Sequence, residues 1–339
     1  MGKVIAKRFI FMIPVVLAVT FIIFMLSFIS AGDAARVLAE KKYEHPSPEQ
    51  VEEVRHEEGL DQPVLVQYGK WLDQALHGDF GKSYSTRKPA FEELKRYFPQ
   101  TFKLAVTSFL LLMIVSVPLG ILSAIYENRV LDKVIRILSS LSVSMPSFWI
   151  GLMLIVVFAR NLGWLPAFGV TEGIRSYILP CITIMLGSFA WTARQMRSSM
   201  LEVIRSDYVT AARAQGFSKL SVHYLHALPN ALIPVVTVLG TQFGMNLGGT
   251  IIIETIFSIP GMGTYIQGGI SSRDLPIVTG SVVFLAMLFC LVMLLVDVLY
   301  AFIDPRIRAQ YERESKRRGR IGKSHGRHGS RAGKECVQA

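Results

Sequence analysis

Long stretches without a charged residue constrain the fold of this chain more than any other feature of its sequence. The six uncharged windows are residues 9–29, 104–125, 137–159, 177–193, 227–253 and 276–296. A helix of about 20 apolar residues spans the hydrocarbon core of a bilayer. A soluble core could hide one such stretch, but six would need a very large core. We therefore predict an all-α polytopic membrane protein with six transmembrane helices.

The composition supports this prediction and excludes several other classes of protein. Hydrophobic residues make up 51% of the 339 residues and charged residues 18%, which is too apolar for an ordinary soluble enzyme. The three cysteines, Cys181, Cys290 and Cys336, provide neither a disulfide framework nor a Cys/His metal cluster. The sequence therefore predicts neither a disulfide-rich secreted fold nor a metal site on this chain.

The first window permits two interpretations. Three basic residues precede it and small residues follow it, as in a cleaved signal peptide. The uncharged stretch of residues 9–29 is longer than the apolar part of a usual signal peptide, so we favour a retained membrane anchor.

Basic residues in the short loops predict the orientation, because Lys and Arg are enriched on the cytoplasmic side. With the N-terminus inside, the cytoplasmic segments hold three basic residues before the first window, three after the second and five after the fourth. Eleven more follow Asp304, whereas the opposite short loops contain only Arg160, Arg175 and Arg273. We therefore expect both termini to be cytoplasmic. The same distribution accounts for the net charge of +11 without a nucleic-acid partner.

The windows divide the chain into four segments. Residues 1–30 hold the N-terminus and the first helix, residues 31–103 form a small extracytoplasmic domain, and residues 104–303 form a five-helix core. Residues 304–339 are basic and poor in large apolar side chains, so we expect a disordered cytoplasmic tail that is solvated or contacts lipid headgroups.

The extracytoplasmic domain carries its own helix signals. Ser47 followed by Pro48 and Gln50 has the form of a helix start. Residues 59–72 predict a turn followed by a second, amphipathic helix with Val66, Trp71 and Leu72 near one face, and Gly78 to Gly81 predict a turn after it.

Residues 207–229, between the fourth and fifth windows, differ from an ordinary connecting loop. Asp207 can cap a helix, and Gly216 can end that helix at a left-handed turn. The small side chains of Ala211 and Ala212 permit close approach of a partner surface. We predict a short cytoplasmic helix with a tight turn that transmits motion from a soluble motor. On these residues alone, a simple connection is an equal alternative.

The same segment resembles a cytoplasmic pattern of ABC importer permeases, E-A-A-x3-G-x9-I-x-L-P. The corresponding positions here are Thr210, Ala211, Ala212, Gly216, His226, Leu228 and Pro229. Five of these seven are identical to the pattern, and the departures are Thr210 for glutamate and His226 for isoleucine. The resemblance implies that this segment couples the membrane helices to an ATPase.

Further motifs resemble the peptide/opine/nickel group of these permeases, and the resemblance extends over residues 1–308. The motifs are residues 59–68, 78–83, 144–148, 163–166, 254–263 and 304–308. The resemblance implies a multi-pass subunit of a bacterial inner membrane that forms a heterodimer with a second, homologous permease. The implied partners are two cytoplasmic ATPase subunits, which bind ATP and Mg, and an extracytoplasmic solute-binding protein. The implied function is ATP-driven alternating access for di- or oligopeptides or a nickel chelate, with peptides slightly favoured.

No catalytic motif accompanies these features, so we expect no enzyme activity and no cofactor on this chain. The G-K-S sequences at 81–83 and 322–324 match only the end of a phosphate-binding G-x4-G-K-[ST] loop, because the first glycine is replaced by Leu76 and by Arg317. One alternative is a secondary transporter, but such a protein should carry charges within its spans, and the six windows contain none. The other alternative is a membrane subunit that does not transport.

The fifth window contains small and polar residues at helical spacing. Gly240, Gly244 and Gly248 recur every four residues and predict close packing against another helix. Gln242 and Asn246 lie on another face, where they can line a pathway for a polar ligand or bond a neighbouring helix.

Two acidic residues stand at the edges of windows. Glu254 follows the fifth window and Asp297 follows the last one, and we expect structural pairing for both. Arg194 is a candidate partner for Asp297.

Overall fold

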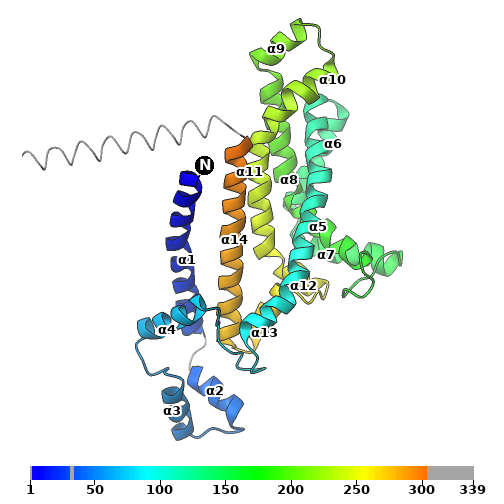
Figure 1. The fold of residues 1–339 in the computed structure, drawn as a ribbon. Coiled ribbons are helices and arrows are strands. Elements are labelled where there is room, and N and C mark those ends of the chain that lie inside the picture. The colour runs from blue at the N-terminus through cyan, green and yellow to red at the C-terminus, as the bar shows by residue number, and fades with distance from the viewer. Residues whose placement is uncertain (1, 31–33, 304–339) are drawn as a thin grey trace, which may run out of the picture.

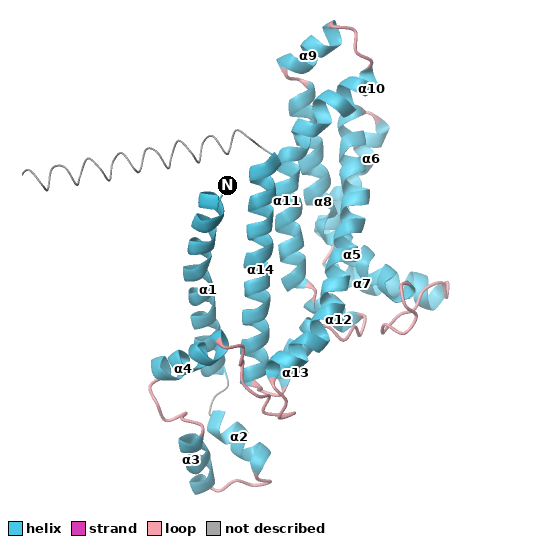
Figure 2. Ribbon diagram, viewed as in Figure 1, coloured by secondary structure: helices cyan, strands magenta, loops and turns pink. Residues whose placement is uncertain are grey.

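The computed structural model describes residues 2–30 and 34–303, so the basic tail predicted at 304–339 lies outside the described residues. Within these ranges the chain is helical and contains no β-strand, only an isolated bridge between Lys82 and Pro89 (Figure 2). The predicted all-α class is confirmed.

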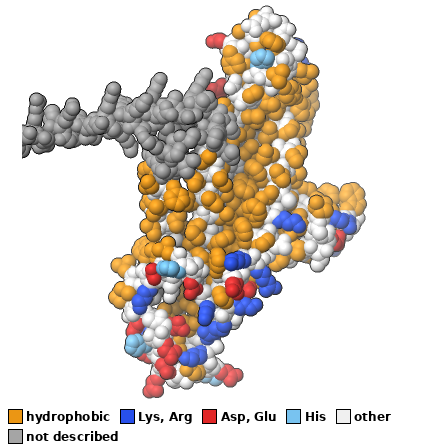
Figure 3. All heavy atoms as spheres, in the orientation of Figure 1, with side chains coloured by type: hydrophobic (Ala, Val, Ile, Leu, Met, Phe, Trp, Pro, Cys, Tyr) orange, Lys and Arg blue, Asp and Glu red, His pale blue; other side chains and the backbone are white. Residues whose placement is uncertain are grey.

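Among the described residues, five helices are long and apolar enough to cross a membrane. They are α1 (Gly2–Ser30), α5 (Ala90–Ile125), α8 (Arg175–Ile204), α11 (Leu228–Gly249) and α14 (Leu275–Ile303). In Figure 1, α5, α8, α11 and α14 form the bundle, and α1 packs against α14 at its edge. Hydrophobic side chains cover the middle of this bundle, whereas charged side chains gather towards the end below it (Figure 3). This distribution is that of a membrane-spanning bundle.

The third window does not form one continuous helix, as expected for a span that a proline interrupts. It is divided into α6 (Val130–Ser144) and α7 (Ser147–Leu154), and α7 continues as the π-helix η1 (Ile155–Asn161). The two arms meet at an angle of 105°, so a sixth span exists only if this bent pair counts as one. The cause is Pro146, which cannot donate a backbone hydrogen bond and disfavours helical geometry at Met145. Met145 is accordingly extended, with φ −100° and ψ 129°.

Residues after the first helix form a small helical insertion of α2 (Ala34–Lys42), α3 (Pro48–Glu57) and α4 (Val64–Leu76). The predicted helix start is confirmed, because the Ser47 hydroxyl accepts from the Gln50 backbone and the Gln50 side chain accepts from the Ser47 backbone. The boundary expected after residue 103 falls inside α5, which begins at Ala90 and continues into the membrane core.

Shorter elements lie at the two ends of the bundle. At one end are α9 (Asp207–Ala214), α10 (Lys219–Ser221) and the π-helix η2 (Val222–Ala227); at the other are α12 (Ile251–Ile256) and α13 (Met262–Ser271). Figure 1 shows the N-terminal end of α1 and the C-terminal end of α14 directed towards the end that carries α9 and α10, with the insertion at the opposite end.

The main core joins the bundle to the α9 end. Leu112 of α5, Met196 and Met200 of α8 and Val235 of α11 are fully buried in one cluster. A Cβ atom at Gly120 would lie 2.6 Å from Cβ of Met196, so the absence of a side chain there allows α5 and α8 to touch. Residues of α9 and η2 belong to the same cluster, which anchors that end to the spans.

Candidate coupling segment and membrane-embedded contacts

The segment predicted to couple to an ATPase begins with α9. Ser206 occupies the N-cap position with extended backbone, and its side chain makes no cap hydrogen bond. The prediction that Asp207 caps the helix is therefore wrong by one position. Asp207 is the first helical residue and is exposed, where its charge interacts favourably with the helix N-terminus.

The two alanines of the predicted motif have different environments. Ala212 is buried with 6% of its surface exposed, next to the fully buried Val209, which packs in the main core. Ala211 is exposed, as is Thr210, whose hydroxyl donates to the Ser206 carbonyl at 3.2 Å. The inner face of α9 thus holds the segment on the bundle, and the outer face is available to a partner.

Gly216 makes the predicted left-handed turn, with φ +85° directly after α9 and its C-cap Gln215. This conformation is disfavoured for residues with a side chain. No atom lies within 4 Å of the site of a Cβ there, so backbone conformation rather than space selects glycine.

Large apolar side chains are exposed around this turn. Leu220 is 70% exposed, Phe217 is 47% exposed and Tyr208 is 45% exposed. The Phe217 ring also contacts the imidazole of His226, the residue that departs from the family pattern, with 4.8 Å between centroids. Clustered exposed apolar side chains at the end of a bundle are typical of an interface with another protein.

The end of the motif lies at the start of α11. Leu228 is half-buried, and Pro229 is exposed in the first turn of this helix. Because Pro229 has no N–H to offer, the preceding turn widens into the π-helix η2. The neighbouring Asn230 donates through Nδ2 to the Tyr208 hydroxyl at 2.8 Å, which ties α9 directly to α11.

A buried ion pair fixes the base of this segment, and sequence reasoning missed it. Arg197 of α8 donates through Nε and Nη2 to the two carboxylate oxygens of Asp132 at 2.8 and 2.9 Å. Asp132 is fully buried on α6 and also accepts from the Ser123 hydroxyl and the Asn128 backbone. Through these contacts the pair joins α5, α6 and α8. Its partners are 65 residues apart in the sequence, and no local pattern signals their contact.

The glycine stripe of α11 packs against α14 at two of its three positions. A Cβ at Gly240 would lie 2.4 Å from Val296 Cγ2, and one at Gly244 would lie 2.7 Å from Met293 Cε. Gly248 has nothing within 4 Å. The predicted helix contact is therefore confirmed for Gly240 and Gly244, whereas no described residue of this chain meets Gly248.

The polar pair on α11 faces α8. The hydroxyl of Ser188 donates to Gln242 Oε1 at 3.2 Å and approaches Asn246 Oδ1 at 3.5 Å. Two functions were predicted for Gln242 and Asn246, and these contacts support the bonding of a neighbouring helix.

Glu254 is fully buried at the opposite end of the bundle, where it organises the turn between α12 and α13. One carboxylate oxygen accepts from Thr101 of α5 at 2.6 Å and from Thr250 at 3.0 Å. The other accepts from the backbone of Gly263 at 2.7 Å and of Thr264 at 3.3 Å. The predicted structural pairing thus consists of hydroxyl and amide donors rather than a cation. The side chain of Asp297 lies outside the described residues.

The insertion is fastened to the start of α14. Asp274 accepts through Oδ2 from the Ser83 hydroxyl at 2.8 Å and from the Ser85 backbone at 2.9 Å, and Lys41 donates to the Ser85 hydroxyl at 2.7 Å. Burial, reinforced by the nearby charge of Asp274, raises the pKa of the Tyr84 hydroxyl above its usual value. These contacts join three separate parts of the chain.

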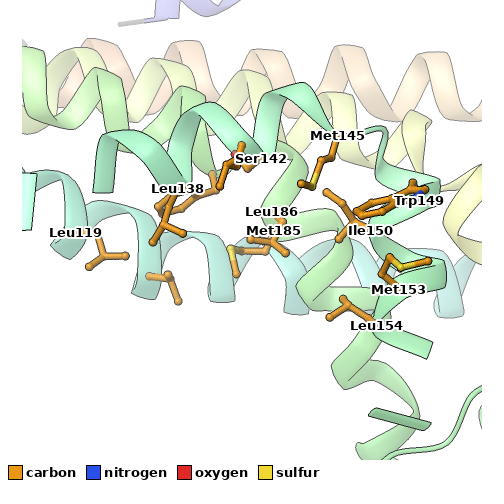
Figure 4. Close-up of a pocket in the computed structure, with 13 residues that line it drawn as sticks. Leu119, Leu138, Ser142, Met145, Trp149, Ile150, Met153, Leu154, Met185 and Leu186 are labelled. Carbon is orange, nitrogen blue, oxygen red and sulfur yellow. The ribbon is translucent and has the colours of Figure 1, made fainter. Parts of the chain in front are cut away.

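An apolar cavity of about 380 Å³ lies in the elbow of the broken third window. Figure 4 shows Leu138 and Ser142 of α6, Trp149 and Met153 of α7 and Met185 of α8 around it. Such a wall offers almost no hydrogen-bonding groups to orient a peptide or a chelate, so we do not assign the solute pathway to it.

Comparison with known families identifies the class of this chain. A family model described as "Binding-protein-dependent transport system inner membrane component" matches residues 116–309, and the corresponding N-terminal family matches residues 1–105. The chain belongs to this family. It is therefore a permease component of a binding-protein-dependent importer in the inner membrane, as the resemblance of its motifs implied.

Full-length relatives of this permease are close in sequence. The dipeptide transport system permease protein DppB of Alkalihalophilus pseudofirmus is 38% identical over 329 residues, covering 89% of this chain and 98% of that protein. The glutathione transport system permease protein GsiC of Salmonella choleraesuis is 38% identical over 302 residues, covering 89% and 97%.

A solved structure has the same fold as this permease. A chain of the MetNI methionine ABC transporter in an inward-facing conformation matches with a TM-score of 0.54 and 17% identity, covering 62% of this chain and 96% of that chain. At this identity the likeness concerns the fold alone.

Proposed function

We propose that this permease carries short peptides into the cell as one half of the translocation pathway of an ATP-driven importer. The relatives named for dipeptide and glutathione transport support this class of solute. Glutathione is itself a peptide, so a site that accepts peptide backbone and carboxylate groups suits both kinds of relative.

The proposed complex contains a second, homologous permease, two ATPase subunits that bind ATP and Mg, and an extracytoplasmic binding protein. In this arrangement the end of the bundle that carries α9 faces the cytoplasm, together with the N-terminal end of α1 and the C-terminal end of α14. The insertion faces the binding protein. The basic residues between the fourth and fifth windows support this orientation. The basic tail at 304–339 then lies in the cytoplasm.

The single observation that carries the proposal is the two-sided construction of the segment at 207–229. Val209 and Ala212 bury its inner face, while Ala211 and Leu220 leave small and apolar groups exposed on its outer side. We infer that the ATPase contacts this outer side. Motion of the ATPase would then reach α11 through the bond between Tyr208 and Asn230.

Within the membrane, α8 and α11 would carry that motion to the pathway. Both helices leave the coupling segment, and the contact of Ser188 with Gln242 joins them farther along. Movement of these helices as a pair against the second permease gives alternating access, because the pathway lies between the two permeases.

Reconstitution tests the proposal. The permease is assembled with its partner permease and ATPases in proteoliposomes, and binding proteins loaded with dipeptides, oligopeptides or nickel chelates are added in turn. We expect peptide-loaded binding protein to stimulate ATP hydrolysis and peptide uptake. Stimulation by a nickel chelate alone would assign the other solute class, and uptake that is independent of ATP would indicate a secondary transporter.

Two matched variants test the coupling segment. Leu220→Ser removes an apolar side chain that is 70% exposed near Gly216, and Leu65→Ser removes one that is 68% exposed on the insertion. We expect Leu220→Ser to weaken retention of the ATPase by the permease in detergent, and Leu65→Ser to leave it unchanged. Equal retention by both variants would contradict the assignment.

A further inference from the structure

Two neighbouring spans share a face that no described part of the chain covers. We call it the open face; it consists of Gly187, Trp191, Arg194 and Ser198 on α8 and Thr237, Thr241, Met245 and Gly248 on α11. The side chains of Trp191 and Met245 are 59% and 60% exposed. A Cβ at Gly187 or Gly248 would meet nothing within 4 Å.

The helical repeat shows that the two exposed stripes lie on the same side. Each residue advances about 100° around a helix of 3.6 residues per turn. On α8, Ser188 faces α11 while Met196 meets Gly120 of α5. On α11, Gln242 faces α8 while Phe243 contacts Phe109 of α5, with 5.0 Å between ring centroids. Because α5 covers one side of both helices, the stripes with Trp191 and Met245 both face away from α5.

Arg194 is the charged residue of this face. Its Nε donates to the Ala190 carbonyl at 3.0 Å, and its guanidinium lies 5.4 Å from the centre of the Trp191 ring. Among the residues that the structure describes, no carboxylate forms an ion pair with it. By contrast, Arg197 and Arg205 on the same helix pair with Asp132 and Glu127.

Arg194 lies at the proposed cytoplasmic end of the fourth uncharged window. It is the first charged residue after the fourth uncharged window, and the paired Arg197 lies about 4.5 Å nearer the coupling segment. Ionisable residues within membrane spans are costly and mark functional pathways or structural pairs. No described carboxylate pairs with Arg194, and the side chain of Asp297, its candidate partner in the sequence, lies outside the described residues. The guanidinium on the open face is therefore available to an anion.

We propose that Arg194, positioned by Trp191, binds the carboxylate of the transported solute on the open face before release into the cytoplasm. This inference rests on the proposed peptide import, and the carboxylate is then the C-terminal one. The planar guanidinium matches a carboxylate through two parallel hydrogen bonds. The cation–π contact with the Trp191 ring holds the guanidinium and leaves its two Nη groups available to a ligand. Every unmodified peptide carries this group, so the contact is independent of the side chains of the cargo.

The rest of the open face suits such a passage. The Thr241 hydroxyl donates to the Thr237 carbonyl of its own helix at 3.0 Å. The threonines therefore present small groups on the open face that bind a passing solute weakly. Met245 has a flexible thioether side chain that adapts to different partners. The one strong contact on the face is therefore the guanidinium of Arg194.

The experiment measures uptake of trialanine per ATP hydrolysed in proteoliposomes containing the whole complex and loaded binding protein. Arg194→Gln removes the charge, and Arg194→Lys keeps the charge without the planar donor pair. The matched control is Arg160→Gln, because Arg160 is also exposed and also follows an uncharged window. The loss of one charge-assisted contact corresponds to about tenfold or more.

We expect Arg194→Gln to reduce trialanine uptake per ATP about tenfold, Arg194→Lys to retain part of it, and Arg160→Gln to leave it unchanged. Stimulation of ATP hydrolysis by the loaded binding protein should stay the same in all three variants. Uptake by Arg194→Gln within twofold of the wild type would overturn the assignment. So would a loss that depends on the content of anionic lipid, since Arg194 would then bind lipid phosphates.

Failure of the proposed function gives a different result. If the wild-type complex shows no ATP-dependent peptide uptake, both the function and the site are overturned. If the wild type transports trialanine and Arg194→Gln transports it equally, only the site at Arg194 is overturned.

Discussion

Removal of one partner from the ion pair between Asp132 and Arg197 should destabilise the protein more than loss of any exposed ion pair. In Arg197→Met, the Asp132 carboxylate stays fully buried and loses two donors at 2.8 and 2.9 Å. Only the Ser123 hydroxyl and the Asn128 backbone remain to solvate it.

The size of the effect follows from burial. Leaving one member of a buried pair without its partner costs about 3–5 kcal/mol. The control is Arg205→Met, whose pair with Glu127 is largely exposed, with 66% of the arginine side chain accessible. Exposed pairs contribute about 0–1 kcal/mol. Arg197 lies on α8, and Arg205 follows eight positions later, directly after this helix. Both variants therefore change the same region of the fold.

The free energy of unfolding of the purified chain is measured in mixed micelles by titration with denaturing detergent. A double variant, Asp132→Leu with Arg197→Met, removes both charges and should be more stable than Arg197→Met alone, because no uncompensated charge remains. If Arg197→Met loses no more stability than Arg205→Met, the ion pair is not what holds α6, α8 and the turn after α5 together.

Four further predictions concern glycines and buried carboxylates. Gly240→Leu should destabilise the chain by about 1–3 kcal/mol through overpacking against α14, whereas Gly248→Leu should change its stability little, as measured by the same unfolding titration. Gly216→Ala should cost about 1–2 kcal/mol locally and lower peptide-stimulated ATP hydrolysis, and Gly216→Asn should cost less because Asn tolerates the left-handed region; equal activity of both variants would contradict this. Glu254→Gln should reduce thermal stability by about 1–3 kcal/mol, since the amide cannot accept from both the hydroxyls and the backbone amides, and an unchanged melting temperature would refute the assignment. Asp274→Asn should weaken the attachment of the insertion by about 1 kcal/mol, which limited trypsin digestion detects as roughly fivefold faster cleavage between α2 and α4.

The spans, and the short helix that ends before Gly216, could be predicted because their signals are local. Six uncharged runs as long as 104–125 together indicate membrane spans, and Gly216 marks a helix end by its own conformational freedom. The helix start at Ser47 was predictable for the same reason, since the capping residues are three positions apart.

The remaining features depend on contacts between distant residues. In the sequence, Asp132 and Arg197 look like ordinary charged residues near loops, because only the fold brings them together. Glu254 likewise accepts hydrogen bonds from donors on two other elements. The proline at 146 indicates a kink within an uncharged window, but it does not predict that the two arms meet at 105°. The opposite environments of Ala211 and Ala212 likewise follow from how α9 rests on the core rather than from residue type.

In the proposed complex, the outer side of the segment at 207–229 meets a partner ATPase. A photo-crosslinking phenylalanine analogue in place of Leu220 tests this directly in the assembled complex, with the same analogue in place of Leu65 as the control. We predict a crosslink from position 220 to the ATPase whose yield changes with ATP, and none to that subunit from position 65. A crosslink from position 220 only to lipid or to the second permease would contradict the account.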